Sequence, residues 1–514
     1  MTADGDDMRS LYPFHGLRGV CSLAIFLGHQ TDIFIDNGNI GLEYLQAVSL
    51  FFLLSGIPLA RLYSTTKKVN TWAGSWSFWS KRAARLGPMY YLALLLNLFC
   101  CIATAERVVL KPALESFFGC AFLLQSWFPA FINVGGVLWQ IAVFAFGYAI
   151  FPFVSRAAHP LGLQALLCGM LSLYIFSAGY FLYRCIAAIV ENPDGSNGGM
   201  MSVMMGAWVW HVHCIARLPQ FVAGVCLGEV LERLRISRSY LSSYQYITVS
   251  AFEPQNEGNA SAAENWGMCA DSLSVFLLGT ALISPLARAL FGTNARDLLS
   301  IAYEAFLLPL HALWLASIVI AYHPRPGQGE SRGRSSSRGG ARRRCYTREA
   351  LSFKPLVFLG DISLAIYCLH IPVLFVYTMV VAYMSTGDWR LTKSIDDVDL
   401  RVRASWFHMP LQWALVLLVS LAANRLFEQP LRKWIMRPSR HGAQHRSSIA
   451  SGREDEEEGK RINDPTQQAY GPGEERGGGK ESSSLLFKPA GVGDINDDGF
   501  TADSLPGREY GTYD

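Results

Sequence analysis

Long runs of apolar residues, interrupted by short polar stretches, recur from about residue 16 to about residue 430. A helix needs about 20 mostly apolar residues to cross the ~30 Å hydrocarbon core of a bilayer, and ten segments of the chain meet this requirement. Their approximate bounds are 15–35, 41–63, 88–105, 136–155, 161–190, 206–231, 271–291, 299–322, 354–384 and 406–428. The pattern predicts an all-α fold, a polytopic bundle of about ten transmembrane helices in a lipid bilayer.

An eleventh apolar segment, about 113–132, determines on which side of the membrane everything after it lies. Loops rich in Lys and Arg tend to stay cytoplasmic. If the N-terminus is cytoplasmic and 113–132 is re-entrant or interfacial, the basic loop 67–85 and four later basic groups all face the cytoplasm. Those groups are Arg156; Arg233, Arg235 and Arg238; the Arg-rich run 325–344; and Arg432, Lys433 and Arg437. We therefore expect both termini to be cytoplasmic, in the plasma membrane or an endomembrane, and the sequon at Asn259 to be unmodified.

The composition agrees with a membrane protein and excludes several other classes. Hydrophobic residues make up 51% of the 514 residues and charged residues only 17%, against roughly 25% in soluble domains. A net charge of +3 is too small to indicate nucleic-acid binding. Most of the eleven cysteines lie in apolar segments and no CxxC pair occurs. We expect them to be packing residues, with no metal site.

Polar composition separates the ends and one loop from the membrane domain. We expect a polar N-terminal segment at 1–13, the membrane domain at 14–435 and a cytoplasmic tail at 436–514. The tail and an insert at about 324–350 are rich in Gly, Ser and charged residues, so both are expected to be disordered. The acidic start of the chain lacks the basic region of a cleaved signal peptide, so the first apolar stretch should remain as an anchor.

Arg18 and His29 are unusual residues for the first apolar segment. A charged side chain near the centre of a spanning helix costs at least ~2.5–3.5 kcal/mol on insertion scales, so it needs a partner or a task. Their spacing of eleven residues is close to three helical turns, which places both side chains on one face, ~16 Å apart along the axis. A histidine that faces substrate is suited to act as a general base. The alternative for His29 is a neutral core histidine bonded to a neighbouring hydroxyl.

Arg82 and Arg85 lie three residues apart, just before Pro88. That spacing places both guanidinium groups on one side of a helical turn, a geometry suited to paired contacts with phosphates. The alternative is a basic anchor at the cytoplasmic end of the third span. His211 and His213 project from opposite sides of their helix, which argues against a shared metal ion.

Seven blocks of sequence follow one another in a distinctive order. They are GLRGVCSLAIFLGH at 16–29, AVSLFFLLSGIPLARLY at 47–63, FWSKRAARLGPMYYLALL at 78–95, the stretch from Asn133 to Pro152, RLPQFVAGVCLG at 217–228, LGDISLAIYCLHIPVL at 359–374 and RLFEQPLRKW at 425–434. Together they resemble the acyltransferase-3 family, multi-span O-acyltransferases of bacterial surface polysaccharides, nodulation factors and macrolides, with animal members of the nose-resistant-to-fluoxetine type. The resemblance extends from about residue 14 to 435, and the order of the blocks carries it.

The resemblance implies an acyltransferase that moves an acyl group, most simply acetyl, from acyl-CoA to a hydroxyl of a carbohydrate or lipid-linked acceptor, without a metal. The group transferred is not an amino-acyl group. The resemblance makes His29 the catalytic base, assisted by Arg18, and assigns acyl-CoA binding to Arg82 and Arg85. It further implies substrate contact or structural support for Ser55, Asn133, Trp139, Tyr148, Arg217, His370 and Glu428.

One position departs from the family pattern. After the tryptophan the family often carries a Glu in a Ser-Val-Glu-Glu-like run, whereas Phe144 and Ala145 stand here. If that acid assists the histidine, either another group such as Glu43 or Asp32 replaces it, or catalysis is impaired. The second hypothesis is therefore a catalytically impaired family member that acts as a transporter or membrane receptor.

Overall fold

Helices account for all the regular secondary structure among the residues that the structure describes. The computed structural model describes residues 12–31, 45–64, 69–104, 110–191, 206–248, 257–291, 293–321, 345–387 and 406–436. They all belong to one compact unit, Met1–Arg437. Most of the predicted segment 1–13, the greater part of the insert 324–350 and nearly all of the tail lie outside the described residues, as do Asp32 and Glu43.

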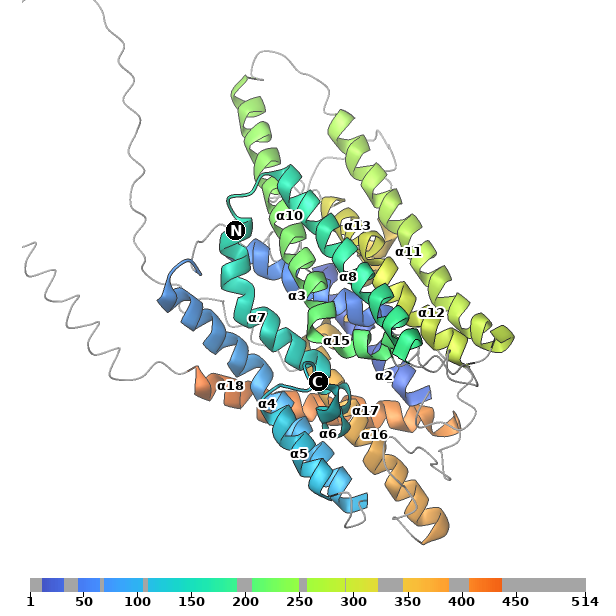
Figure 1. Ribbon diagram of the computed structural model, residues 1–514. Coiled ribbons are helices and arrows are strands. Elements are labelled where there is room, and N and C mark those ends of the chain that lie inside the picture. The colour runs from blue at the N-terminus through green and yellow to red at the C-terminus, as the bar shows by residue number, and fades with distance from the viewer. Residues whose placement is uncertain are drawn as a thin grey trace, which may run out of the picture. The chain divides into compact units, whose positions relative to one another are not determined.

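The first half of the chain contributes seven described α-helices to the bundle in Figure 1. They are α2 (Tyr12–His29), α3 (Leu45–Ser64), α4 (Trp72–Thr104), α5 (Leu110–Ala121), α6 (Ile132–Gly135), α7 (Trp139–Ala158) and α8 (Leu163–Glu191). The second half contributes α10 (Cys214–Thr248), α11 (Glu257–Phe291), α12 (Thr293–Phe306), α13 (Leu308–Ile320), α14 (Tyr346–Leu351), α15 (Lys354–Asp361), α16 (Ser363–Thr386), α17 (Met409–Ala423) and α18 (Gln429–Ile435). A π-helical turn at Asn424–Glu428 joins α17 to α18.

Seven helices among the described residues are long and apolar enough to cross a membrane, which confirms the polytopic helical fold. They are Leu45–Tyr63, Trp72–Ala103, Gly136–Ala158, Leu163–Ala187, Cys214–Leu234, Ser363–Ser385 and Met409–Ile435. The predicted spans 15–35, 271–291 and 299–322 are not among these seven. The last of them is divided at Leu307 into α12 and α13, because Pro309 in the first turn of α13 lacks the N–H that would continue the helical hydrogen bonds to the carbonyl oxygen of Ala305.

The start of α4 and the end of α5 bear on two further predictions. The expectation that Pro88 opens the third span is wrong, because α4 begins at Trp72 and continues through Pro88. Arg82 and Arg85 therefore lie inside a long helix and not in a loop before it. In the segment 113–132, α5 ends after only 12 residues. A helix of that length measures ~18 Å and cannot cross the hydrocarbon core, in agreement with a segment that does not span.

The predicted insert also ends earlier than expected, because α14 occupies Tyr346–Leu351. All eleven cysteines are free thiols, and six of them are buried, as expected of packing residues. Among the described residues, no group of three or more His, Cys, Asp or Glu side chains could hold a metal ion.

Close backbone contact between α3 and α10 forms the centre of the bundle. A Cβ atom added at Gly56 would lie 2.5 Å from the carbonyl oxygen of Phe221, and one added at Gly224 would lie 2.6 Å from that of Leu53. Small residues at such crossings let membrane helices approach closely. The glycine of the sequence block around Ser55 is therefore explained by packing, since any side chain at position 56 would separate the two helices.

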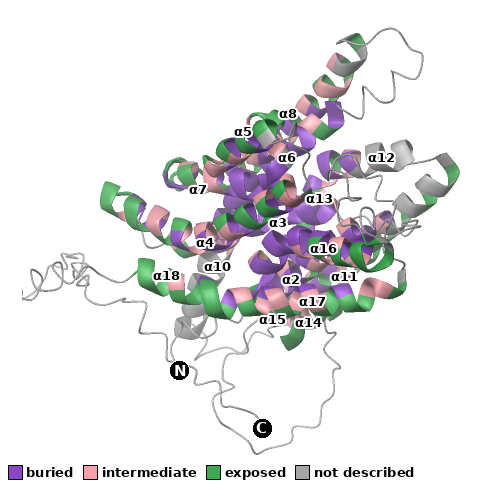
Figure 2. Cartoon of the chain, turned by 90° about the horizontal axis from the view of Figure 1, so that it is seen from below, coloured by how far each residue is buried: buried purple, intermediate pink, exposed green. Residues whose placement is uncertain are grey.

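The first helix is held by the last third of the chain. A Cβ atom added at Gly19 would lie 2.5 Å from the carbonyl oxygen of Leu356, which shows how closely α2 packs on α15. At the other end of α2, the Gln30 amide donates to Gln412 of α17 and accepts from the indole N–H of Trp413. Figure 2 shows α2 and α3 largely buried, with exposed residues on the outer helices such as α4 and α18. α2 is thus an interior helix, which suits its polar residues.

Candidate functional site

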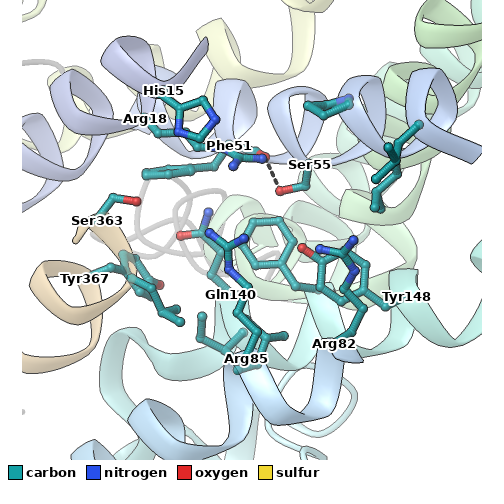
Figure 3. A pocket seen from close by; sticks show the side chains of 17 residues that line it. His15, Arg18, Phe51, Ser55, Arg82, Arg85, Gln140, Tyr148, Ser363 and Tyr367 are labelled. Atoms are coloured by element: carbon teal, nitrogen blue, oxygen red, sulfur yellow. Dashed lines mark hydrogen bonds between the residues drawn. The ribbon is translucent and has the colours of Figure 1, made fainter. Parts of the chain in front are cut away.

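A pocket of about 340 Å³ lies between α2, α3, α4, α7 and α16. Three arginines line it, Arg18 from α2 and Arg82 and Arg85 from α4. Figure 3 shows Arg82 and Arg85 rising from α4 toward Arg18 and Ser55 on the opposite wall. No Asp or Glu is among the described residues that line the pocket, so this lining is cationic. The structure therefore brings together three basic residues that the sequence analysis singled out separately.

Arg18 connects two of the helices around the pocket. Its Nη2 donates a hydrogen bond to the carbonyl oxygen of Leu54 on α3, at 2.7 Å. The side chain is partly buried and lines the pocket. One donor of the guanidinium therefore fixes its position, while the planar group keeps further N–H donors for a ligand.

Arg82 is held by aromatic rings and not by a carboxylate. Its guanidinium carbon lies 5.3 Å from the centre of the Phe78 ring and 5.8 Å from that of Tyr148, distances at which a cation is attracted by a ring face. Its Nε is buried and has no hydrogen-bond partner among the described residues. Tyr148 itself lines the pocket, and its carbonyl oxygen accepts from the indole N–H of Trp79 at 3.1 Å.

Arg85 is close to the closing sequence block. The charges of Glu428 and Arg432 both act on it. Glu428 is buried in the π-helical turn and accepts a hydrogen bond from Nδ2 of Asn424 at 2.8 Å. Among the described residues, neither Arg82 nor Arg85 has a carboxylate within ion-pair distance. Glu428 is therefore near Arg85 and has Asn424 as its hydrogen-bond partner.

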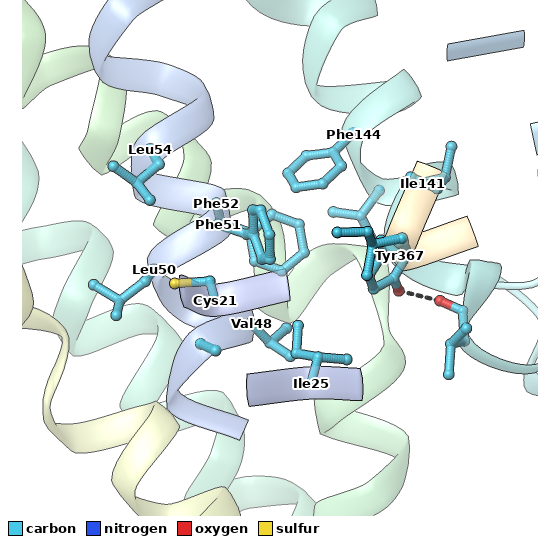
Figure 4. Close-up of a cluster of buried hydrophobic side chains, with 14 of the residues drawn as sticks. Cys21, Ile25, Val48, Leu50, Phe51, Phe52, Leu54, Ile141, Phe144 and Tyr367 are labelled. Carbon is cyan, nitrogen blue, oxygen red and sulfur yellow. Dashed lines mark hydrogen bonds between the residues drawn. The ribbon is translucent and has the colours of Figure 1, made fainter. Parts of the chain in front are cut away.

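The remaining wall of the pocket is mostly apolar. Phe144, which stands where the family often has an acid, lies 4.9 Å from Phe52 and is stacked on Tyr148 at 6.3 Å, measured between ring centres. Figure 4 shows it in the buried cluster of Phe51, Phe52 and Tyr367. Ser55 also lines the pocket, and its hydroxyl donates to the carbonyl oxygen of Phe51 at 2.8 Å. The pocket thus joins a cationic side to an aromatic side.

His29 is not among the described residues that line this pocket. Its ring is stacked on that of His370 from α16, with centres 5.4 Å apart and planes at 22°. Nδ1 of His370 donates to the carbonyl oxygen of Tyr367 at 2.9 Å, which leaves Nε2 as the acceptor. That Nε2 is buried and unpaired among the described residues. Tyr367 lines the pocket and lies 6.1 Å from His370, so one ring separates the arginines from the paired histidines.

Arg217 lies in a different environment, a buried polar cluster behind the aromatic wall. Its Nη2 donates to Oε2 of Glu304 at 2.6 Å, and both side chains are fully buried. The same Oε2 lies 2.6 Å from Nδ1 of His211. The Trp139 ring lies 4.8 Å from that of His211, and the Arg217 guanidinium lies 5.7 Å from the Trp139 ring centre. Arg217 and Trp139, expected to support the site, are therefore in contact with each other but not with the pocket.

Two further residues from the sequence analysis, Asn133 and His213, are not among the described residues that line the pocket. Asn133 is in the short helix α6, and its side chain lies outside the described part of the chain. His213 contacts the rings of Trp127 and Tyr180, away from the partners of His211, as expected for residues on opposite sides of a helix.

Sequence reasoning missed three residues that the structure places at or behind the site. Glu304 is an acid inside a predicted span, so the rule that selected Arg18 would also have found it. His311 is fully buried with neither ring nitrogen paired among the described residues. Gln140 is 1% exposed, lines the pocket and has no partner for either amide atom within the described residues. A neutral amide gives no charge signal, and only the fold reveals that Gln140 is unpaired.

Comparison with known proteins gives one match. A family model described as an acyltransferase domain, the acyltransferase-3 model, matches residues 12–424. No curated protein and no solved structure matches the chain. The matched range contains all the residues that line the pocket and both stacked histidines.

Proposed function

Because this chain is a membrane acyltransferase of the acyltransferase-3 family, we propose that it transfers an acetyl group from acetyl-CoA to a hydroxyl of a carbohydrate or lipid-linked acceptor. The observation that carries this proposal is the pocket with three arginines and, among its described lining residues, no carboxylate. Three positive charges in such a lining favour an anionic ligand, and an acyl-CoA carries its negative charge on phosphates at the end remote from the thioester.

Arg82 and Arg85 are the residues we assign to the CoA phosphates. Their planar guanidinium groups match phosphate oxygens through paired hydrogen bonds, and neither is occupied by an ion pair among the described residues. The volume of about 340 Å³ is at the lower end of ligand pockets, roughly 300–1,000 Å³, so the pocket holds only part of a long donor. The aromatic side then receives the less polar arm of CoA, with the acyl end directed toward Tyr367.

His29 is the base in this proposal, and the stacked His370 supports it. The base removes the proton of the acceptor hydroxyl as the oxygen attacks the thioester carbonyl carbon. The carbon–sulfur bond then breaks, and the CoA thiolate takes up the proton from the histidine. A positioned base contributes typically ~10²–10⁴ in rate. Arg18 orients the donor or stabilises the negative charge that develops on the carbonyl oxygen.

The orientation of the membrane domain follows the location of the donor. Acyl-CoA is cytosolic, so we propose that the pocket opens to the cytoplasm and that both termini lie on that side. Arg85 on α4 and Arg432 on α18 are close enough for their charges to interact, and Lys81 and Lys433 flank them. A concentration of basic residues at this end of the bundle supports a cytoplasmic face.

Purified full-length protein in lipid nanodiscs tests the reaction. With acetyl-CoA and extracts of carbohydrate or lipid-linked acceptors, mass spectrometry should detect free CoA and acetylated hydroxyls in equal amounts. We expect His29→Ala to reduce CoA release by at least about 100-fold. His213→Ala is the matched control, since His213 contacts Trp127 and Tyr180 and is remote from the stacked pair.

The control variant should keep wild-type turnover. Unchanged turnover in His29→Ala would eliminate His29 as the base. Movement of acceptor across the membrane without consumption of acetyl-CoA would instead support the transporter hypothesis. In that case Phe144, in place of the acid, would mark a family member that kept the fold and lost the acyltransferase activity.

A further inference from the structure

Gln140 combines two properties that rarely occur together. It is almost fully buried, and both its Oε1 and its Nε2 have no hydrogen-bond partner among the described residues. Leaving such a group unpaired costs about 1–3 kcal/mol, so buried amides almost always have partners. Each unpaired buried polar group in a native protein therefore needs an explanation, and a bound ligand is one.

The position of Gln140 favours a ligand. It lies in the first turn of α7 and lines the same pocket as the arginines. Figure 3 shows Gln140 and Arg85 directed into one space below Arg18, with Tyr367 on one side and Arg82 and Tyr148 on the other. The neighbouring lining residues Ile141 and Phe144 are apolar, so they supply no donor or acceptor to the amide.

We infer that Gln140 is a specificity residue that binds the two amides of the pantetheine arm of CoA. This rests on the proposed function, because it takes acyl-CoA as the donor. A primary amide presents one acceptor and two donors, and a secondary amide presents one of each. The N–H and C=O of one trans amide point in opposite directions, so Gln140 accepts from the N–H of one of the two pantetheine amides and donates to the carbonyl oxygen of the other. The arginines bind the phosphates, and Gln140 binds the pantetheine arm between the phosphates and the thioester.

Equilibrium binding to the full-length protein separates these two parts of the ligand. The probes are CoA, which carries the pantetheine arm, and adenosine 3′,5′-bisphosphate, which lacks it. The test variant is Gln140→Met, which keeps the length of the side chain and removes the amide. We expect Gln140→Met to weaken CoA binding about tenfold, the effect of one lost pair of hydrogen bonds, and to leave the bisphosphate Kd unchanged. Arg82→Ala should weaken both probes.

A second measurement distinguishes a ligand-binding amide from a structural one. If Gln140 has no partner in the unliganded protein, Gln140→Met should leave the unfolding temperature unchanged or raise it. A lower unfolding temperature, or an equal loss for both probes, would overturn the assignment. CoA binding without turnover would reject the proposed reaction and leave Gln140 standing. Wild-type protein that does not bind CoA would reject both.

Discussion

Arginine occurs in two contrasting environments in this molecule. Arg217 is fully buried and donates to Glu304, itself fully buried, at 2.6 Å. Arg82 and Arg85 line a pocket and have no carboxylate within ion-pair distance among the described residues. The aromatic wall that includes Phe52 and Trp139 lies between the two environments.

The difference shows how the same side chain serves the fold in one place and a ligand in the other. A buried charge that is neutralised by a partner of its own chain is satisfied before any ligand arrives. Arginines that face a cavity without a counter-charge keep their hydrogen-bond donors available. We therefore interpret the Arg217 cluster as structural and the pocket as the donor site, and the following changes test that division.

Removing Arg217 should have the largest effect. Arg217→Ala leaves the Glu304 carboxylate buried with only the His211 imidazole beside it, and breaking a buried ion pair typically costs about 3–5 kcal/mol. We expect a large loss of folded protein, measured as the monodisperse fraction in detergent and as the unfolding temperature. The double variant Arg217→Met with Glu304→Met removes both charges and should recover most of the stability. Equal destabilisation by the single and double variants would show that the pair itself is not what the fold requires.

Removing Arg85 should affect binding and not folding. Arg85→Ala deletes a charge-assisted contact worth about 1.5–3 kcal/mol, so CoA should bind roughly 10- to 100-fold more weakly. The unfolding temperature should be unchanged or slightly higher, because repulsion among Arg18, Arg82 and Arg85 is relieved. Arg85→Lys keeps the charge without the paired geometry and should fall between the two. Destabilisation comparable to that of Arg217→Ala would remove the contrast.

An acid placed in the pocket should neutralise its arginines, as Glu304 neutralises Arg217 in the buried cluster. Phe144→Glu introduces a carboxylate beside the arginines, where it competes with phosphate, and we expect about a tenfold loss of CoA affinity. Phe144→Gln controls for polarity and size, and should have a smaller effect on affinity. An increase in turnover in Phe144→Glu would mean instead that catalysis in this chain is limited by the missing acid.

Ionic strength should affect the pocket and the Arg217–Glu304 pair differently, and this difference should be the smallest of the four effects. Raising the ionic strength from 0.05 M to 0.5 M screens charges in a solvent-accessible pocket much more than a buried pair. We expect the Kd for CoA to rise several-fold, measured by equilibrium binding, while the unfolding temperature changes little. A potassium chloride series at constant detergent and lipid provides the control for the unfolding measurement.

The sequence predicted the parts of the site that depend on local spacing. The three-residue separation of Arg82 and Arg85 placed both on one side of a helix, and both line the pocket. The rule that a charge inside a span needs a reason selected Arg18, which lines it too. Local spacing did not predict helix ends that depend on packing, such as the continuation of α4 through Pro88.

Relations between distant segments were beyond the sequence for a physical reason. The stacking of His29 on His370 joins the first helix to α16, and no local periodicity encodes that approach. Arg18 and His29 share one face of α2, but their surroundings differ because the neighbours of a helix change along its length. Arg18 lines the pocket on one side of Tyr367, and His29 stacks on His370 on the other side. Gln140 was not predicted because its significance lies in the partners that it lacks.

The packing of α2 has a consequence for biosynthesis. The ribosome makes this helix long before α15 and α17, yet its glycine face packs on α15 and Gln30 bonds to α17. Until those helices are inserted, Arg18 and His29 lack their final neighbours and remain in contact with the insertion machinery or with lipid. Truncated chains that stop before Met409 would carry every pocket arginine and still leave the end of α2 without its anchor. Maturation of this protein is therefore expected to be slow, dependent on assisting factors, and sensitive to premature termination.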